Sequence, residues 1–157
     1  MSILILGIGN LLLCDESIGI RVATELENDP ALEGIDVLDG GTGGFHLMGT
    51  LQEYDDVVLI DATLDSMPPG TIRVLKPKYS TDYPSLMSAH EIGLKTMIDA
   101  MILNGKIPNM HLVIISVKKV DDFGMELTPE VEAVIPEVKE VVRKIVKQIK
   151  KGETVIV

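Results

Sequence analysis

The chain has very few aromatic residues and no tryptophan. Aromatic side chains make up 3% of its 157 residues, whereas apolar residues make up 46%. A core without large rings must be built from aliphatic side chains and methionine, which is typical of a buried sheet covered by helices. No linker, repeat or low-complexity segment interrupts the chain, and its length suits one core. We therefore expect residues 1–157 to form a single domain.

Cysteine is almost absent, and long apolar stretches are absent. The one cysteine, Cys14, excludes an internal disulfide and fits a reducing compartment, so we expect a cytoplasmic protein. Glycines and Asn10 interrupt the apolar start of the chain, which also lacks the basic residues of a signal peptide. No apolar stretch approaches the roughly 18 residues that a membrane-spanning helix needs, so we expect no membrane insertion.

Positive charge is scarce. The chain has 14 Lys and Arg residues against 24 Asp and Glu residues, for a net charge of -10. This charge repels phosphate backbones and argues against nucleic-acid binding. Six of the basic residues lie in the segment 139–157, as expected for a solvated helix face with cations near its C-terminal end. A partner that binds the acidic remainder should carry basic groups.

Short apolar runs alternate with helical patterns along the chain. Strands are predicted at residues 3–6, 35–38, 57–60, 71–75 and 112–117. The turn before residues 71–75 is too short for a parallel crossover, which leaves an antiparallel direction open for that strand. Helices are predicted from residue 18, around 45–51, from 88 to about 104, and from 128 to 151. This order predicts a three-layer α/β/α fold with a doubly wound, mostly parallel five-stranded sheet.

The ends of the later helices carry clear signals. Ser88 and Glu91 have the spacing of a capping box, and Gly105 should end the helix that they begin. The last helix should begin at Thr128 and Pro129, kink or restart at Pro136, and end at residue 152.

The segment after the first strand resembles a dinucleotide fingerprint but departs from it. Gly7 and Gly9 match, and Asp39 stands where a ribose-binding acid would sit. However, Leu12 replaces the third glycine, and two carboxylates follow where the pyrophosphate should meet helix amides. We therefore expect no nucleotide cofactor.

Three residues could meet at the carboxyl edge of the sheet, where ligands of such folds bind. Glu16 lies in the first loop with Asp15, Asp61 follows the third strand, and His90 is in the first turn of a helix, where the dipole favours neutral imidazole. Two carboxylates and an imidazole suit Ni, Zn, Mn or similar ions and leave open positions. Taken singly, each has a structural explanation: Asp15 or Glu16 can stabilise a helix start, Asp61 can cap a loop, and His90 can be a surface residue.

Five blocks of sequence, in order and at the expected separations, carry a resemblance to a known family. They are residues 7–19 (GIGNLLLCDESIG), 39–42 (DGGT), 61–62 (DA), 88–94 (SAHEIGL) and 124–129 (GMELTP). On these blocks the chain resembles the nickel-iron hydrogenase maturation endopeptidases. The resemblance extends over nearly the whole chain.

The resemblance implies a function and a partner. Members of this family remove a C-terminal extension from the hydrogenase large-subunit precursor after nickel insertion, and their metal-contacting residues fall on Glu16, Asp61 and His90. The nickel is expected to arrive with the precursor, and the protein is expected to be a monomer or a weak homo-oligomer.

The catalytic group stays open at the level of sequence. A metal-bound water could be the nucleophile, or Asp39 could act as general base while nickel positions the substrate. A thiol peptidase based on Cys14 and His90 is a weaker alternative, since Cys14 follows three leucines and resembles a packed residue. From another class, a non-catalytic nickel sensor or metallochaperone would need the same ligands.

Overall fold

A computed structural model describes residues 2–9, 12, 14–41, 47–76, 90–118, 124, 126–153 and 155, and for residues 90–95 it describes the backbone only. The strands are β1 (Ile3–Gly7), β2 (Asp36–Asp39), β3 (Asp56–Thr63), β4 (Ile72–Leu75) and β5 (Asn109–Ser116). The α-helices are α1 (Ile18–Leu26), α2 (Met48–Leu51), α3 (His90–Leu103), α4 (Pro129–Glu132) and α5 (Ile135–Lys150), and two short 3-10 helices are η1 (Cys14–Ser17) and η2 (Pro30–Leu32).

The strands form one five-stranded sheet in the order β2-β1-β3-β5-β4. Strands β2, β1, β3 and β5 are parallel, whereas β4 pairs with β5 in the antiparallel direction. The predicted mostly parallel sheet is confirmed, including the antiparallel strand. The bounds of two strands were wrong: β5 begins at Asn109 and not at residue 112, and β3 continues to Thr63, so Asp61 lies inside the strand and not after it.

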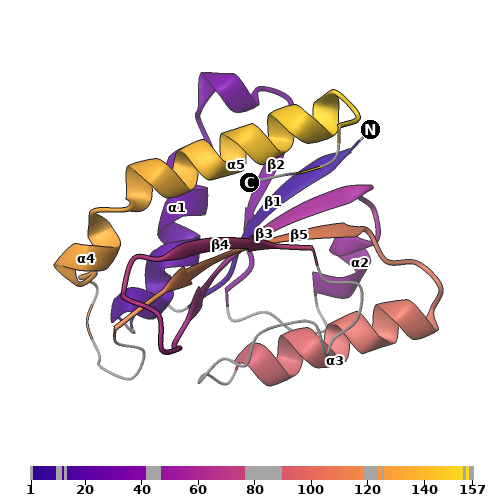
Figure 1. The fold of residues 1–157 in the computed structure, drawn as a ribbon. Coiled ribbons are helices and arrows are strands. Elements are labelled where there is room, and N and C mark those ends of the chain that lie inside the picture. The colour runs from indigo at the N-terminus through magenta and orange to yellow at the C-terminus, as the bar shows by residue number, and fades with distance from the viewer. Residues whose placement is uncertain are drawn as a thin grey trace.

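Helices cover both faces of the sheet, which confirms the three-layer fold (Figure 1). Residues of α1 and α5 pack with one set of strand side chains, and this side is called the α5 face. Residues of α2 and α3 pack with the other set, on the α3 face. Because side chains alternate along a strand, successive residues of β3 belong to opposite faces. Within the described part of the chain, every helix is too short or too polar to cross a bilayer.

The helix ends follow the predicted signals. Gly105 has a φ of 79°, and the amides of residues 105 and 106 donate to Ile102 O and Met101 O, which is a Schellman end of α3. Gly152 ends α5 in the same way, and the helix restarts between α4 and α5 with Pro136 in its new first turn. The capping box of Ser88 and Glu91 lies outside the described residues and side chains.

Two glycines allow α1 to lie directly against the sheet. A Cβ atom added to Gly19 would be 2.3 Å from Ile60 O and 2.4 Å from Ile8 O. One added to Gly7 would be 2.4 Å from Gly19 O. Real Cβ atoms do not come this close to backbone oxygens, so only glycine fits both positions. The contact brings the start of α1, and η1 before it, onto the carboxyl ends of β1 and β3.

We predict that Gly19→Ala lowers the free energy of unfolding by about 2–4 kcal/mol, because the helix must move away from the sheet. Gly49→Ala is the matched control. Gly49 is exposed in α2 with no atom near its added Cβ, so alanine there should be neutral or stabilise by up to about 1 kcal/mol. Urea denaturation of both variants measures the difference, and equal stabilities would contradict the close-contact account.

Candidate functional site

The sheet has one point where the chain changes direction, between β1 and β3. From β1 the chain passes outward to β2, whereas from β3 it continues on the other side to β4 and β5. Ligands of doubly wound folds bind in the crevice at the carboxyl ends of such a pair of strands. Here the loop after β1 enters this crevice: the amide of Ile8 donates to Ile60 O at 3.0 Å, and the amide of Gly9 donates to Gly41 O at 2.8 Å.

Glu16 lies at this crevice. It belongs to η1, which follows the loop after β1 and packs against β3. The backbone of Gly9 lies directly over that of Glu16, since an added Cβ on Gly9 would be 2.0 Å from Glu16 O. The side chain is 4% exposed. The structure thus places one of the predicted ligands, as a buried carboxylate, beside the end of β3.

Asp61 lies in β3 near its carboxyl end and is 1% exposed. Val57 and Leu59 belong to the core of the α3 face, so by alternation Asp61 points to that face as well. Its Oδ1 accepts a hydrogen bond from the amide of Ala62 at 2.8 Å. This bond fixes the orientation of the carboxylate at the end of the strand.

His90 is the first residue of α3, on the same face as Asp61. Helix α3 ends at Leu103, shortly before β5 begins at the amino edge of the sheet, and it runs antiparallel to β5 (Figure 1). Its first residue therefore lies toward the carboxyl edge. The structure brings the backbone of His90 to the edge and face on which Asp61 lies, and its side chain is not among those described.

Asp39 is the last residue of β2 and lies at the same edge of the sheet, but farther from β3. In the register of the sheet, Asp39 and Ile60 are both level with Gly7, so two strand spacings, roughly 10 Å, separate the backbones of Asp39 and β3. The side chain is exposed, and its Oδ1 accepts a hydrogen bond from the amide of Gly41 at 2.8 Å. Asp39 is thus an accessible carboxylate beside the crevice.

Asp15, which the sequence could not separate from Glu16, has a different role. Its carboxylate is fully buried and accepts hydrogen bonds from the amide of Thr128 at 2.7 Å and from the amide of Lys118 at 3.1 Å. The hydroxyl of Thr128 also donates to it. Asp15 therefore joins η1 to the segment after β5 and to the start of α4, and it anchors the loop that carries Glu16.

Among the side chains that the structure describes, no three His, Cys, Asp or Glu residues form a group able to hold a metal ion. The side chains of Glu16 and Asp61 are among those described, whereas the side chain of His90 is not. The geometry therefore gives two buried carboxylates and the start of a histidine-bearing helix toward one edge of the sheet.

Known proteins match the chain in sequence and in structure. The model of the hydrogenase maturation protease family HycI matches residues 20–148. The chain belongs to this family. A hydrogenase 2 maturation protease from Escherichia coli is 34% identical over 141 residues, which cover 86% of this chain and 84% of that protein. The solved structure of the hydrogenase maturating endopeptidase HybD from E. coli has a TM-score of 0.84 at 32% identity, over 97% of this chain and 94% of that one.

A second solved relative, the HybD hydrogenase maturation protease from Thermococcus kodakarensis, has a TM-score of 0.74 at 29% identity, over 92% of this chain and 98% of that one. The resemblance read from the sequence blocks is therefore confirmed. So is the class of activity: the chain is a hydrogenase maturation endopeptidase, and not a nickel sensor without activity.

A group of polar residues near Asp61 was not predicted from the sequence. We call it the polar strip: Thr63, Ser116, Asp65 and Arg73. The alternation of side chains in β3 could have identified Thr63, which is two residues after Asp61 and so shares its face. Ser116 and Arg73 come from other strands and could be placed only by the sheet register, whereas Asp65 follows β3 closely.

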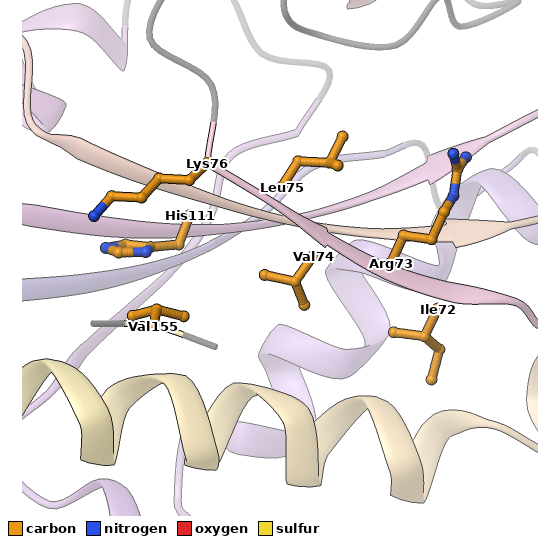
Figure 2. Close-up of a pocket in the computed structure, with 7 residues that line it drawn as sticks. All are labelled: Ile72, Arg73, Val74, Leu75, Lys76, His111 and Val155. Carbon is orange, nitrogen blue, oxygen red and sulfur yellow. The ribbon is translucent and has the colours of Figure 1, made fainter. Parts of the chain in front are cut away.

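The protease also has a cavity away from this edge. It has a volume of about 350 Å³ and lies under β4, where Ile72, Val74 and His111 point toward α5 (Figure 2). His111 is buried, and its Nε2 lies 3.0 Å from Asp56 Oδ1 near the amino edge of the sheet. Most of the cavity therefore lies on the other face from Asp61, and none of the predicted site residues lines it.

We predict that Asp15→Asn destabilises the protease by about 2–4 kcal/mol, since the amide group would turn a donor toward Thr128 or Lys118 and the charge would be lost. Asp55→Asn is the control. Asp55 is exposed and accepts from the amide of Ser2 at 3.1 Å, so its change should stay within about 0.5 kcal/mol. If thermal or urea unfolding showed the same small effect for both variants, Asp15 would not be an anchor.

Proposed function

We propose that this protease removes the C-terminal extension from the large-subunit precursor of a nickel-iron hydrogenase after nickel has been inserted. We further propose that Glu16, Asp61 and His90 recognise the nickel, which belongs to the substrate. The observation that supports this proposal is that η1 with Glu16 packs against β3, which carries Asp61 near its carboxyl end, and that the first residue of α3, His90, lies toward the same edge of the sheet.

Burial supports a cation partner. Two carboxylates that are 4% and 1% exposed lie toward the same edge of the sheet, where they have little contact with bulk water. A divalent ion is a suitable partner for buried carboxylates. Carboxylate oxygens and an imidazole nitrogen also suit nickel, and three protein ligands leave room for ligands that the precursor supplies.

With this arrangement, processing would depend on the presence of nickel in the substrate. In the proposed complex the nickel is already held by cysteines of the precursor, and the three protease residues complete its coordination. Docking of the ion would bring the scissile bond to the carboxyl edge. A precursor without nickel would lack this contact and would be ignored.

For the chemical step we propose Asp39 as the general base that activates a water molecule. It lies at the same edge, is exposed to solvent, and is held in one orientation by the amide of Gly41. A nickel-bound water is the competing nucleophile, in which case Asp39 would have no role in bond cleavage.

Other expectations from the sequence also stay proposals. We propose a cytoplasmic location from the single cysteine, Cys14, and we expect no nucleotide and no nucleic-acid partner. A monomer or a weak homo-oligomer is the expected state in solution.

We predict that the protease shortens the nickel-loaded precursor by one C-terminal peptide and leaves the nickel-free precursor intact, as seen by mass spectrometry. Glu16→Gln and His90→Ala should each lower the processing rate by about 100-fold or more, since each removes a ligand. Glu27→Gln, an exposed glutamate at the end of α1, is the matched control and should retain full activity. Normal processing by His90→Ala would contradict the shared-nickel site.

We predict that Asp39→Asn lowers kcat by about 100-fold or more while the KM for the nickel-loaded precursor and the melting temperature stay near those of the wild type. Asp36→Asn is the control, because Asp36 is an exposed carboxylate at the start of the same strand. A wild-type kcat for Asp39→Asn would remove its role as base and favour the nickel-bound water.

A further inference from the structure

The polar strip lies beside Asp61 on the α3 face. Thr63 is level with Ser116 in the sheet, and the two side chains are 1% and 0% exposed. The hydroxyl of Ser116 donates to Asp65 Oδ1 at 3.0 Å, and Asp65 Oδ2 pairs with the guanidinium of Arg73. The strip thus runs from β3 across β5 to β4.

The register fixes how the strip relates to the candidate site. Asp61 and Arg73 are both level with Ile114, so they lie in one row, separated by two strand spacings of roughly 10 Å in total. Arg73 points away from α5, opposite to Ile72 and Val74, and therefore toward the face of Asp61 (Figure 2). The strip begins next to Asp61 and leads away from the crevice between β1 and β3.

Two hydrogen-bond donors of the strip are buried without an acceptor. Among the described residues, neither Thr63 Oγ1 nor Arg73 Nε has a hydrogen-bond partner. Buried polar groups are almost always paired, because an unmade hydrogen bond costs free energy. One of these donors is in the row of Asp61, and the other is two residues after Asp61 in β3, so both lie beside a proposed ligand.

We propose that the polar strip is a peptide-binding subsite, in which Thr63 Oγ1 and Arg73 Nε donate hydrogen bonds to main-chain carbonyl oxygens of the precursor near the scissile bond. This inference rests on the proposed function, which brings that segment to the carboxyl edge. Asp65 neutralises the guanidinium of Arg73, so the pair suits a neutral carbonyl better than a carboxylate.

The variant Thr63→Val tests the subsite, because it keeps the branched shape and removes the hydroxyl. It should raise the KM for the nickel-loaded precursor about tenfold, with little change in kcat and no loss in melting temperature, since the hydroxyl has no partner to lose. Thr63→Ser should restore wild-type KM. Arg73→Lys, which keeps the charge and lacks the Nε donor, should also raise KM.

Thr24→Val is the control for removal of a hydroxyl. Thr24 lies in α1, on the other face of the sheet, and its Oγ1 donates to Ile20 O at 2.8 Å. Because this hydroxyl is far from the strip, its removal should leave the KM unchanged. If Thr63→Val lowered the melting temperature and left KM unchanged, the hydroxyl would have a structural role and the subsite would be wrong.

Calorimetric binding of the nickel-loaded precursor separates this proposal from the proposed function. If the wild type binds the precursor without cutting it, and Thr63→Val binds about tenfold more weakly, the proposed processing fails and the subsite stands. If the wild type cuts the precursor and Thr63→Val binds and cuts equally well, the subsite alone fails. If the wild type neither binds nor cuts, both are wrong.

Discussion

The start of α1 lies so close to β1 and β3 that no side chain fits at Gly7 or Gly19. Added Cβ atoms at Gly7 and Gly19 would lie within 2.4 Å of backbone oxygens, so the start of the helix is pressed onto the carboxyl ends of the two strands. Because η1 directly precedes α1, this contact fixes where Glu16 lies. The buried carboxylate of Asp15 then ties η1 to Thr128 and Lys118. The candidate site is therefore built on backbone packing before any ligand arrives.

The site draws its residues from both layers of helices. Glu16 comes from the segment that leads into α1, on the α5 face, whereas Asp61 and the start of α3 belong to the α3 face. They lie toward the same edge of the sheet, and between β1 and β3 is the point where the chain changes direction across the sheet. An ion or peptide bound there would contact both layers, and the polar strip extends the same edge toward β4.

Periodicity and turn chemistry predicted the fold because they are local. The apolar runs gave the five strands, and Gly105, Pro136 and Gly152 marked helix ends through backbone conformations that their neighbours do not share. The end of β3 was missed since its last residues, polar or small, read as a loop. The roles of Asp15 and Glu16 could not be separated, because the partner that decides the role of Asp15, Thr128, lies 113 residues away. The strip was missed for the same reason, and the ligand set stays a prediction carried by family resemblance.

The central claim is that nickel in the precursor gains ligands from the protease. Nickel K-edge X-ray absorption, recorded on the nickel-loaded precursor alone and after rapid freezing with the protease, tests this directly. The account predicts that mixing adds oxygen or nitrogen neighbours to the nickel, and that Glu16→Gln weakens this change. An identical nickel spectrum with and without bound protease would contradict it.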